Sequence, residues 1–300
     1  MDLDAELNAL ATQEDLPADL LRRLLPHPAA RRSIALLRRD LTEDVIEEII
    51  RLGSVRTLAA NSSVPPQIRA HLAEHAEPSV RCAVAASVGD EPPGLLSRLA
   101  DDPDPSVRSF LAMNEHLPPE LLARLASDVE PSVRSSVTQH RRDAPDAVRR
   151  TLLADADPDI RRAAVHAYVP PADLLARLLA DPVTRAAAVQ HTTPTRELAT
   201  DLDSDVREAI AAHPDLPVDL RDLLANDPDA FVRNAIVARA DTPPALRERL
   251  VAGLEPDSPL AGWMLSFARG GGRTSPPPAE RRPQRLSREQ AEALLSRVGL

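Results

Sequence analysis

The feature that most constrains this sequence is a short internal repeat. An arginine in similar local surroundings recurs every 22 to 27 residues between positions 31 and 233. A period near 25 residues, sustained over much of a chain, is typical of supersecondary units that stack and contact only their neighbours. The members of the series are Arg31, Arg56, Arg81, Arg108, Arg134, Arg161, Arg185, Arg207 and Arg233.

An acidic residue and a proline mark a helix start in most repeats. The acid lies four residues before the arginine in seven of the nine repeats, and proline follows the acid in five of these. A carboxylate at the N-cap accepts hydrogen bonds from unpaired backbone amides, and proline at the first helical position has no amide to lose. We therefore expect a short first helix in each repeat, with the arginine one turn along and able to pair with that acid. The acids are Glu77, Asp104, Glu130, Asp157, Asp181, Asp203 and Asp229, and the prolines are Pro78, Pro105, Pro131, Pro158 and Pro182.

A second helix is predicted after another proline. Proline occupies this place in nine of ten repeats, and Thr42 occupies it in the other. Two apolar residues, two others and two more apolar residues then follow, as at positions 121–126. This spacing puts the apolar residues on one stripe that a single repeat cannot cover, so the repeats must stack. In this register Leu121 is expected in the core and Arg124 in solvent. The prolines are Pro17, Pro65, Pro92, Pro118, Pro145, Pro170, Pro194, Pro217 and Pro243.

The composition agrees with thin layers of short helices. Aromatic residues make up 2% of the chain, and Ala, Leu, Val and Ile supply nearly all of the 43% hydrophobic content. Such content suits short packed helices better than a deep core. The sequence therefore predicts an all-α fold, an α-solenoid of about ten two-helix repeats of ~25 residues.

The run Leu117–Asp128, followed by Glu130–Arg134, closely resembles the leucine-rich repeat variant family, which grades into HEAT-like repeats. The resemblance covers roughly residues 5–260. It implies a right-handed superhelix of alternating short helices, one of each pair often 3₁₀-like. Members of that family can carry an N-terminal iron–sulfur cluster, which needs about four thiolates. This chain has Cys82 as its one cysteine, so we expect no cluster and no other cofactor.

The pattern divides the chain into three parts. Residues 1–268 are predicted to form the solenoid, with the apolar residues between Leu260 and Phe267 closing its last face. Residues 269–286 contain three consecutive glycines and three consecutive prolines and are predicted to be a flexible basic linker. Residues 287–300 open with Ser-Arg-Glu-Gln, a capping-box sequence, and are predicted to form a short amphipathic helix. A helix this short is marginal alone. It is expected to dock either on its own solenoid or on a partner, and the sequence favours neither.

The charge distribution weighs against nucleic acid and membrane as partners. Residues 1–268 hold 29 arginines against 43 acidic residues, a net charge of −14, whereas residues 269–300 hold 7 arginines against 3 acids. An acidic body repels phosphate and anionic lipid. No run is long enough for a membrane span, and residues 1–10 lack a signal peptide's basic start, so a cytoplasmic location is expected. The leading hypothesis is a non-catalytic scaffold that binds a protein or peptide. The alternatives are a HEAT-like DNA-binding or DNA-repair protein and, third, a metal or redox protein.

One stretch, His71–His75, matches an inverted zinc-protease pattern of two histidines one turn apart with a glutamate between them. Aligned with the neighbouring repeats, both histidines are expected in solvent, and no third ligand is evident. We interpret the match as coincidence, and expect no bound metal. The sequence also shows no glycine-rich phosphate loop and no nucleophile with an evident base, so no enzymatic activity is predicted.

Two sets of residues are candidates for partner contact. Several first helices end in Asn or His five or six residues after the arginine, and this row forms either a polar face for a partner or a set of helix ends that satisfy loop carbonyls. Four arginines surround one turn between helices, and form either a clamp for acidic side chains or phosphate or a solvated charge run. The first set comprises Asn61, Asn114, His140, His166, His191 and His213, and the second Arg141, Arg142, Arg149 and Arg150.

Overall fold

A computed structural model describes residues 3–87, 89, 93–252 and 286–300. Within these ranges every regular element is a helix, and no strand is present. The prediction of an all-α fold is confirmed. The helices fall into two compact units, one of residues 1–148 with 279–300 and one of residues 149–278. We call them unit 1 and unit 2 and describe each by itself.

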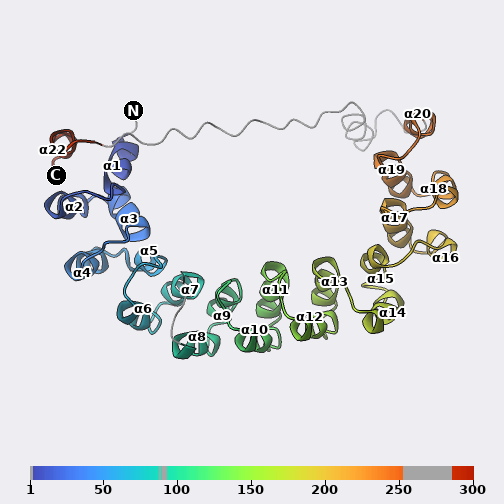
Figure 1. The fold of residues 1–300 in the computed structure, drawn as a ribbon, viewed down its shortest axis with the longest axis horizontal. Coiled ribbons are helices and arrows are strands. Elements are labelled where there is room, and N and C mark those ends of the chain that lie inside the picture. The colour runs from blue at the N-terminus through green and yellow to red at the C-terminus, as the bar shows by residue number, and fades with distance from the viewer. Residues whose placement is uncertain (1–2, 88, 90–92, 253–285) are drawn as a thin grey trace. The chain divides into compact units, whose positions relative to one another are not determined.

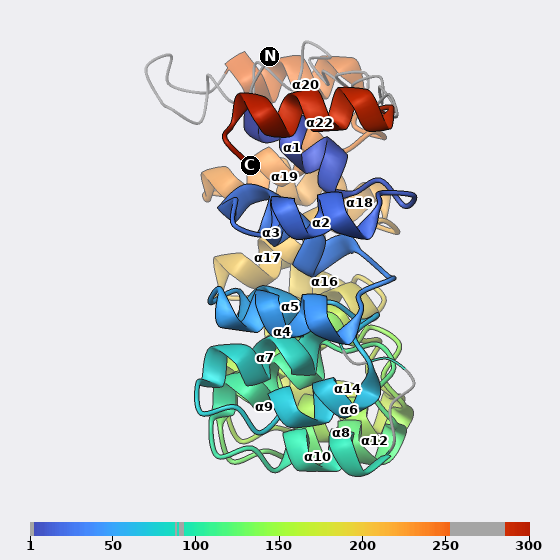
Figure 2. The ribbon, with the colours of Figure 1, turned by 90° about the vertical axis from the view of Figure 1, so that its left-hand side faces the viewer.

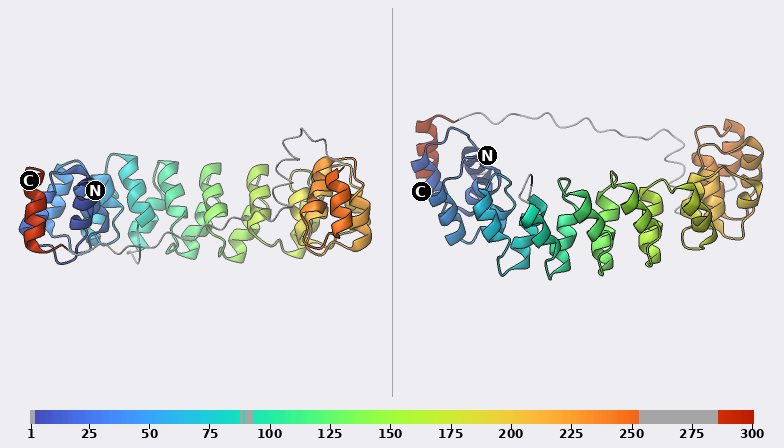
Figure 3. Two further views of the ribbon diagram at one scale, coloured as in Figure 1. Left: turned by 90° about the horizontal axis from the view of Figure 1, so that it is seen from above. Right: turned by 60° about the horizontal axis from the view of Figure 1, so that its bottom comes forward.

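Unit 1 contains two alternating sets of helices. The odd-numbered helices are the predicted first helices of the repeats, and each packs on the next odd-numbered one, as α7 does on α9 and α9 on α11 (Figure 1). The even-numbered helices form a second row beside them, which Figure 3 shows from two further directions. The odd set is α1 (Leu3–Ala11), α3 (Pro28–Leu37), α5 (Val55–Ala59), α7 (Pro78–Ser87), α9 (Pro105–Ala112) and α11 (Pro131–His140). The even set is α2 (Ala18–Leu24), α4 (Glu43–Arg51), α6 (Pro66–Leu72), α8 (Pro93–Ala100) and α10 (Pro119–Leu125), with α22 (Arg288–Arg297) from the far end of the sequence.

Unit 2 follows the same alternation. The predicted first helices again pack on one another, α15 on α17 and α17 on α19. They are α13 (Pro158–Ala167), α15 (Arg185–Ala188) with the 3₁₀ turn η1 (Val189–His191), α17 (Ser204–Ala212) and α19 (Ala230–Ala238). Beside them lie α14 (Ala172–Ala180), α16 (Arg196–Ala199), α18 (Val218–Leu224) and α20 (Pro244–Ala252), while α12 (Asp146–Leu153) spans the boundary between the units.

Most first helices begin as the sequence predicts. Asp104 is the N-cap of α9, its carboxylate accepts from the Ser106 amide, and Pro105 is the first helical residue. The prediction of a helix start at Pro182 is wrong, because α15 begins at Arg185 with Thr184 as its N-cap. There Asp181 directly follows the last residue of α14, which leaves no room for a separate capping acid.

The predicted buried stripe of the second helices is confirmed in α2, where Leu20, Leu21, Leu24 and Leu25 are all buried, and is one residue narrower in α10. In α10, Leu122 and Leu125 are fully buried, whereas Leu121 is only half-buried. The choice of Leu121 as the core marker of this helix is therefore wrong by one position. The exposure of Arg124 is confirmed, and its guanidinium forms an ion pair with Asp101 near the surface.

The C-terminal helix forms as predicted. Ser287 accepts a hydrogen bond from the Gln290 amide, and the Gln290 side chain accepts one from the Ser287 amide, which completes the capping box. The helix belongs to unit 1. The predicted linker, up to residue 285, and the apolar segment between Leu260 and Phe267 lie outside the described residues. In the described part of the chain no helix is long and apolar enough to cross a membrane.

Candidate functional site

The repeated arginines link each repeat to the next one. Arg108 binds Asp128 through Nε at 2.7 Å and Nη2 at 2.9 Å, twenty residues along the chain. Its remaining nitrogen, Nη1, donates to the backbone oxygen of Asp102 at 2.7 Å. The guanidinium therefore joins the loop before its own helix to the corresponding loop of the following repeat. We call this contact the Arg–Asp staple.

The staple recurs in both units and corrects the predicted pairing. The acid four residues before the arginine does not pair with it but caps the helix, as Asp104, Asp157, Asp203 and Asp229 do. Except at Asp181, the partner is an additional aspartate two residues before the next cap, which also accepts a backbone hydrogen bond, as Asp102 does from the Asp104 amide. The sequence signal that would have found it is the recurring Asp-x-Asp or Asp-x-Glu. The staples are Arg81–Asp102, Arg108–Asp128, Arg161–Asp181, Arg185–Asp201 and Arg207–Asp227.

The staple aspartates are held ionised. Burial raises the pKa of Asp128, but the hydrogen bonds from Arg108 and the Glu130 amide outweigh it, so the pKa lies below its ordinary value. The same causes place the pKa values of Asp102 and Asp227 below their ordinary range. Because both partners of these pairs are largely buried, losing one partner leaves a charge in a poorly solvated position.

One junction in unit 1 lacks the staple on both sides. In α5 the residues Leu58 and Ala59 are buried like Leu111 and Ala112 of α9, which puts Val55, not Arg56, at the staple position. The assignment of Arg56 to the arginine series is therefore wrong by one residue. At the corresponding loop, His75 replaces the aspartate, and its Nδ1 accepts from the Glu77 amide. Arginine and aspartate are thus replaced together.

The polar helix ends are mostly internal. Asn114 is buried, its Nδ2 donates to the Ala85 oxygen of the preceding repeat, and its Oδ1 accepts from the His116 amide. A ring nitrogen of His191 lies 2.8 Å from the Val165 oxygen, and the buried His213 accepts from the Asp215 amide through Nδ1. These three side chains satisfy backbone groups within the stack and do not form a contact row. His140 and His166 are exposed.

The four candidate arginines have different surroundings. Arg141 is buried and donates to the Asn114 oxygen at 2.8 Å while pairing with Asp143. Arg150 is exposed and pairs with Asp173 at 2.7 Å. Arg142 is exposed and Arg149 half-buried. The first two of the four belong to unit 1, and the last two to unit 2. Arg141 therefore serves the stack, because its guanidinium is buried and bonded within unit 1.

The residues of the zinc-protease pattern are engaged elsewhere or point to solvent. Glu74 pairs with Arg98, His75 holds its own loop, and His71 is exposed. Among the residues that the structure describes, no three His, Cys, Asp or Glu side chains are grouped so as to hold a metal ion. That the match is coincidental stays a prediction.

A groove of about 810 Å³ runs across four first helices of unit 1. Its floor is built from small side chains on α5 and α7, among them Ala60, Ala83 and Ala86, because small residues are the ones that allow these helices to pack closely. Leu36 of α3 and Phe110 of α9 also line it, each about 40% exposed. Sequence reasoning missed this groove, and we call it the unit 1 groove.

The unit 1 groove carries unsatisfied positive charge. Arg32 and Arg56 line it, both are exposed, and neither forms a hydrogen bond or ion pair with any part of the chain that the structure describes. The one acid that lines it, Asp104, already accepts from the Ser106 amide as a helix cap. An apolar floor with free guanidinium groups suits a ligand that combines apolar side chains with carboxylates.

Cys82 also lines this groove, and its surroundings disfavour the thiolate. Burial raises its pKa, and the carboxylates of Asp104 and Asp102 raise it further, against the lowering effects of Arg81 and Arg56. A thiol with a raised pKa holds little thiolate at neutral pH. The groove therefore offers binding contacts and no evident catalytic group.

Comparisons with family models and with curated proteins find no match to this chain. The groove, its charges and the staples are therefore the observations from which a function is argued.

Proposed function

We propose that this chain is a non-catalytic scaffold, a right-handed α-solenoid of about ten two-helix repeats, as its resemblance to the leucine-rich repeat variant family implies. The period of the sequence and the staples support this, because each staple joins one repeat to the next and to no other. Stacked repeats present a long surface whose exposed positions vary freely while the interior ones are fixed.

The surface that binds a partner is the unit 1 groove. The observation that carries this proposal is the pair of unpartnered guanidinium groups, Arg32 and Arg56, beside an apolar floor. In a chain of net charge −10, with most other described arginines in ion pairs or hydrogen bonds, a free cationic pair in a groove is exceptional. Arginine also forms strong two-pronged hydrogen bonds with carboxylates.

The ligand we propose is a peptide segment of another protein that carries at least one acidic side chain and one bulky apolar side chain. The carboxylate binds Arg32 or Arg56, and the apolar side chain packs near Leu36 or Phe110. A length of groove that spans four helices suits a continuous segment rather than a small metabolite.

A random peptide library displayed on phage, selected on the full chain, tests this proposal. Ala86→Trp places a large side chain on the groove floor, and Ala212→Trp is its matched control, since both alanines are exposed and lie five residues after Arg81 and Arg207. We expect enriched peptides with acidic and apolar residues, bound by the wild type and the control but not by Ala86→Trp. A basic consensus, or equal binding to both variants, contradicts the proposal.

A salt titration of duplex DNA binding distinguishes the DNA-binding alternative from the scaffold function. The proposal expects no tight binding of duplex DNA near physiological salt, about 0.15 M. Tight binding that Arg32→Glu and Arg56→Glu remove would favour the DNA-binding function instead.

The solenoid itself is tested by deleting Arg108–Ile160, which joins Val107 to Arg161. Both sides of the junction are equivalent places, because Val107 and Ile160 are each buried just before a staple arginine. If repeats contact only their neighbours, the shortened protein keeps a cooperative helical unfolding transition by circular dichroism. Aggregation or loss of helix would contradict the arrangement.

A further inference from the structure

The C-terminal helix α22 occupies a seat formed by the first two helices of the chain. Ala291, Leu294 and Leu295 are buried in one apolar cluster with residues of α1 and α2, such as Leu7 and Leu20. Figure 2 shows α22 in front of α1 and above α2, the helix on which it packs. Helix α22 therefore covers an apolar face that α1 and α2 form together.

Charged contacts surround the apolar part of the seat. Arg288 pairs with Asp19 at 3.0 Å, and Arg297 pairs with Glu6 at 3.3 Å. Arg23 in turn donates to the backbone oxygen of Leu300. The helix thus offers two cations to two acids of the seat, which sets its direction and register.

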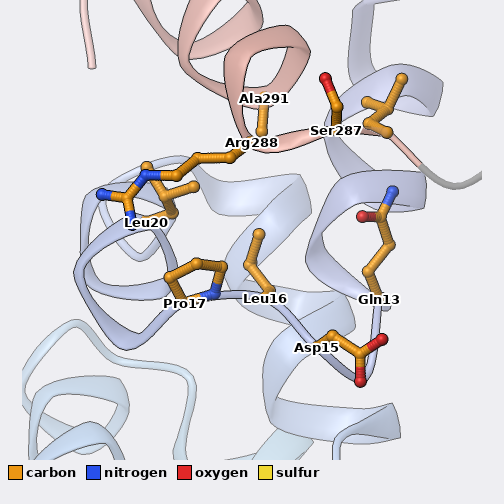
Figure 4. A pocket seen from close by; sticks show the side chains of 9 residues that line it. Gln13, Asp15, Leu16, Pro17, Leu20, Ser287, Arg288 and Ala291 are labelled. Atoms are coloured by element: carbon orange, nitrogen blue, oxygen red, sulfur yellow. The ribbon is translucent and has the colours of Figure 1, made fainter.

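The packing at one end of the seat is incomplete. A cavity of about 160 Å³ lies between the start of α22 and the loop before α2, with Leu16, Leu20 and Ala291 among its lining residues (Figure 4). Gln13 also lines it, and its buried Nε2 has no hydrogen-bond partner among the described residues. A void and an unpaired donor both weaken a contact relative to a close-packed interior. The helix is therefore held less firmly than the helices within the stack.

The sequence does not restrict the seat to the helix of the same chain. Residues 253–287 separate α20 from α22 in the sequence, a connection of 35 residues. Every residue that contacts α22 in the apolar cluster or by charge is supplied by the other part of unit 1 alone. The chain's own α22 therefore competes for the seat with α22 of another molecule. The effective concentration of the chain's own helix at its seat is on the order of millimolar or lower for a long tether.

We propose that the seat on α1 and α2 binds α22 of a second copy of this chain, and that two copies exchange their C-terminal helices reciprocally. An exchanged dimer makes two copies of the contact seen in one molecule and requires no new surface. This proposal rests on the seat alone and is independent of the groove ligand.

Two full-length variants with reversed charges test the exchange. In the seat variant, Glu6→Arg and Asp19→Arg repel the chain's own helix; in the helix variant, Arg288→Glu and Arg297→Glu repel the chain's own seat. Each variant alone is mismatched in every arrangement. When the two variants are mixed, a reciprocal heterodimer has attracting charges at both contacts. The wild-type helix of the seat variant lies on the wild-type seat of the helix variant, and at the other contact the acidic and basic residues have changed places.

Native mass spectrometry and fluorescence energy transfer between labelled copies measure the outcome. We expect about tenfold more dimer in the mixture than in either variant alone, the factor that four exposed repelling pairs replaced by attracting ones supply. A chain carrying all four substitutions is the control, because it restores the match within one molecule and is expected to behave as the wild type.

A mixture with no more dimer than the separate variants would overturn the proposal. So would a mixed dimer that survives Leu294→Asp with Leu295→Asp in both chains, because another surface would then hold it. Loss of the mixed dimer in these variants, with the stack still helical by circular dichroism, supports exchange through α22.

Discussion

Units 1 and 2 share their interior and differ on the open face of their first helices. The residue after the staple position is Arg32, Arg56 or Cys82 in three repeats of unit 1 and Arg162 or Glu208 in two of unit 2. In unit 1 both arginines are without partners in the described chain, whereas Arg162 pairs with Asp159. The staples, in contrast, have the same geometry in both units. Positions that hold the stack are repeated, and positions that face outward are not.

The open face of unit 2 carries acidic side chains, in contrast to the arginines on the face of unit 1. Burial raises the pKa of Glu208, and the neighbouring carboxylates of Asp205 and Asp229 raise it further. This face is expected to repel the acidic segments that we propose as ligands of the unit 1 groove. One framework thus carries surfaces of opposite charge, and only one of them suits the proposed ligand.

The largest effects are expected in the shared interior. Leu125→Ala in unit 1 and Leu224→Ala in unit 2 remove fully buried side chains at equivalent places of α10 and α18. Each is expected to cost about 3 kcal/mol of unfolding free energy in denaturant titrations, within the usual range for such cavities. Leu121→Ala, at a half-buried position, is the control and should cost less than half as much. Equal losses at Leu121 and Leu125 would contradict the observed register.

Breaking the staple should come next in size. Asp128→Ala and Asp227→Ala each strand a largely buried arginine and leave a backbone amide without its acceptor. We expect a loss of about 2–3 kcal/mol in either unit. His75→Ala, at the junction that has no staple, should cost less than about 1 kcal/mol, since it removes one loop hydrogen bond. The same loss of unfolding free energy at all three sites would show that the ion pair of the staple does not contribute to stability.

The staple also shows which contacts could not be predicted from the sequence. The repeated arginine and the capping acid are evident from spacing, and local spacing favours pairing within one helix. The true partner lies twenty residues away because the following repeat stacks against the first, as Asp128 does for Arg108. Stacking distance is a property of the packed molecule, and only the additional aspartate two residues before the capping acid indicates it in the sequence.

The candidate site was less predictable than the fold. All-α structure, the capping box at Ser287 and most first-helix starts follow from local residue patterns. The groove depends on which helix positions remain open after packing, and the misplacement of Arg56 by one residue concealed its exposure. The seat of α22 depends on a contact between the two ends of the sequence, which no periodic pattern encodes.

Acid should weaken both units in the same way. The pKa values of Asp128 and Asp227 are lowered in the folded chain from their ordinary value of 3.8. Their contribution to stability is therefore fully present above that value and is lost as the pH falls through the lowered folded values. Urea titrations between pH 7 and pH 2 should show this acid-dependent loss, and Asp128→Asn or Asp227→Asn should each reduce it. An unchanged pH dependence in both variants would contradict the origin assigned to these shifts.

The smallest effects on stability, and the sharpest contrast in binding, are expected on the open faces. Arg56→Glu and Glu208→Arg exchange the charges of equivalent positions and should alter the unfolding free energy by no more than about 0.5 kcal/mol. Arg56→Glu should abolish binding of the selected acidic peptides in fluorescence polarisation, whereas Glu208→Arg should leave it unchanged. Loss of binding in both would remove the distinction between the units.

The missing staple also makes one junction of unit 1 mechanically different. Between α5 and α7 the stack has Val55 and His75 at the two staple positions, and the groove crosses this same junction, with Arg32 and Arg56 before it and Phe110 after it. The Ser87 hydroxyl donates to the Ala59 oxygen across it at 2.8 Å, but the charged cross-link of the staples is missing. A junction without this cross-link is expected to resist shear less than a stapled one, and a peptide bound in the groove as we propose would link its two sides as a splint.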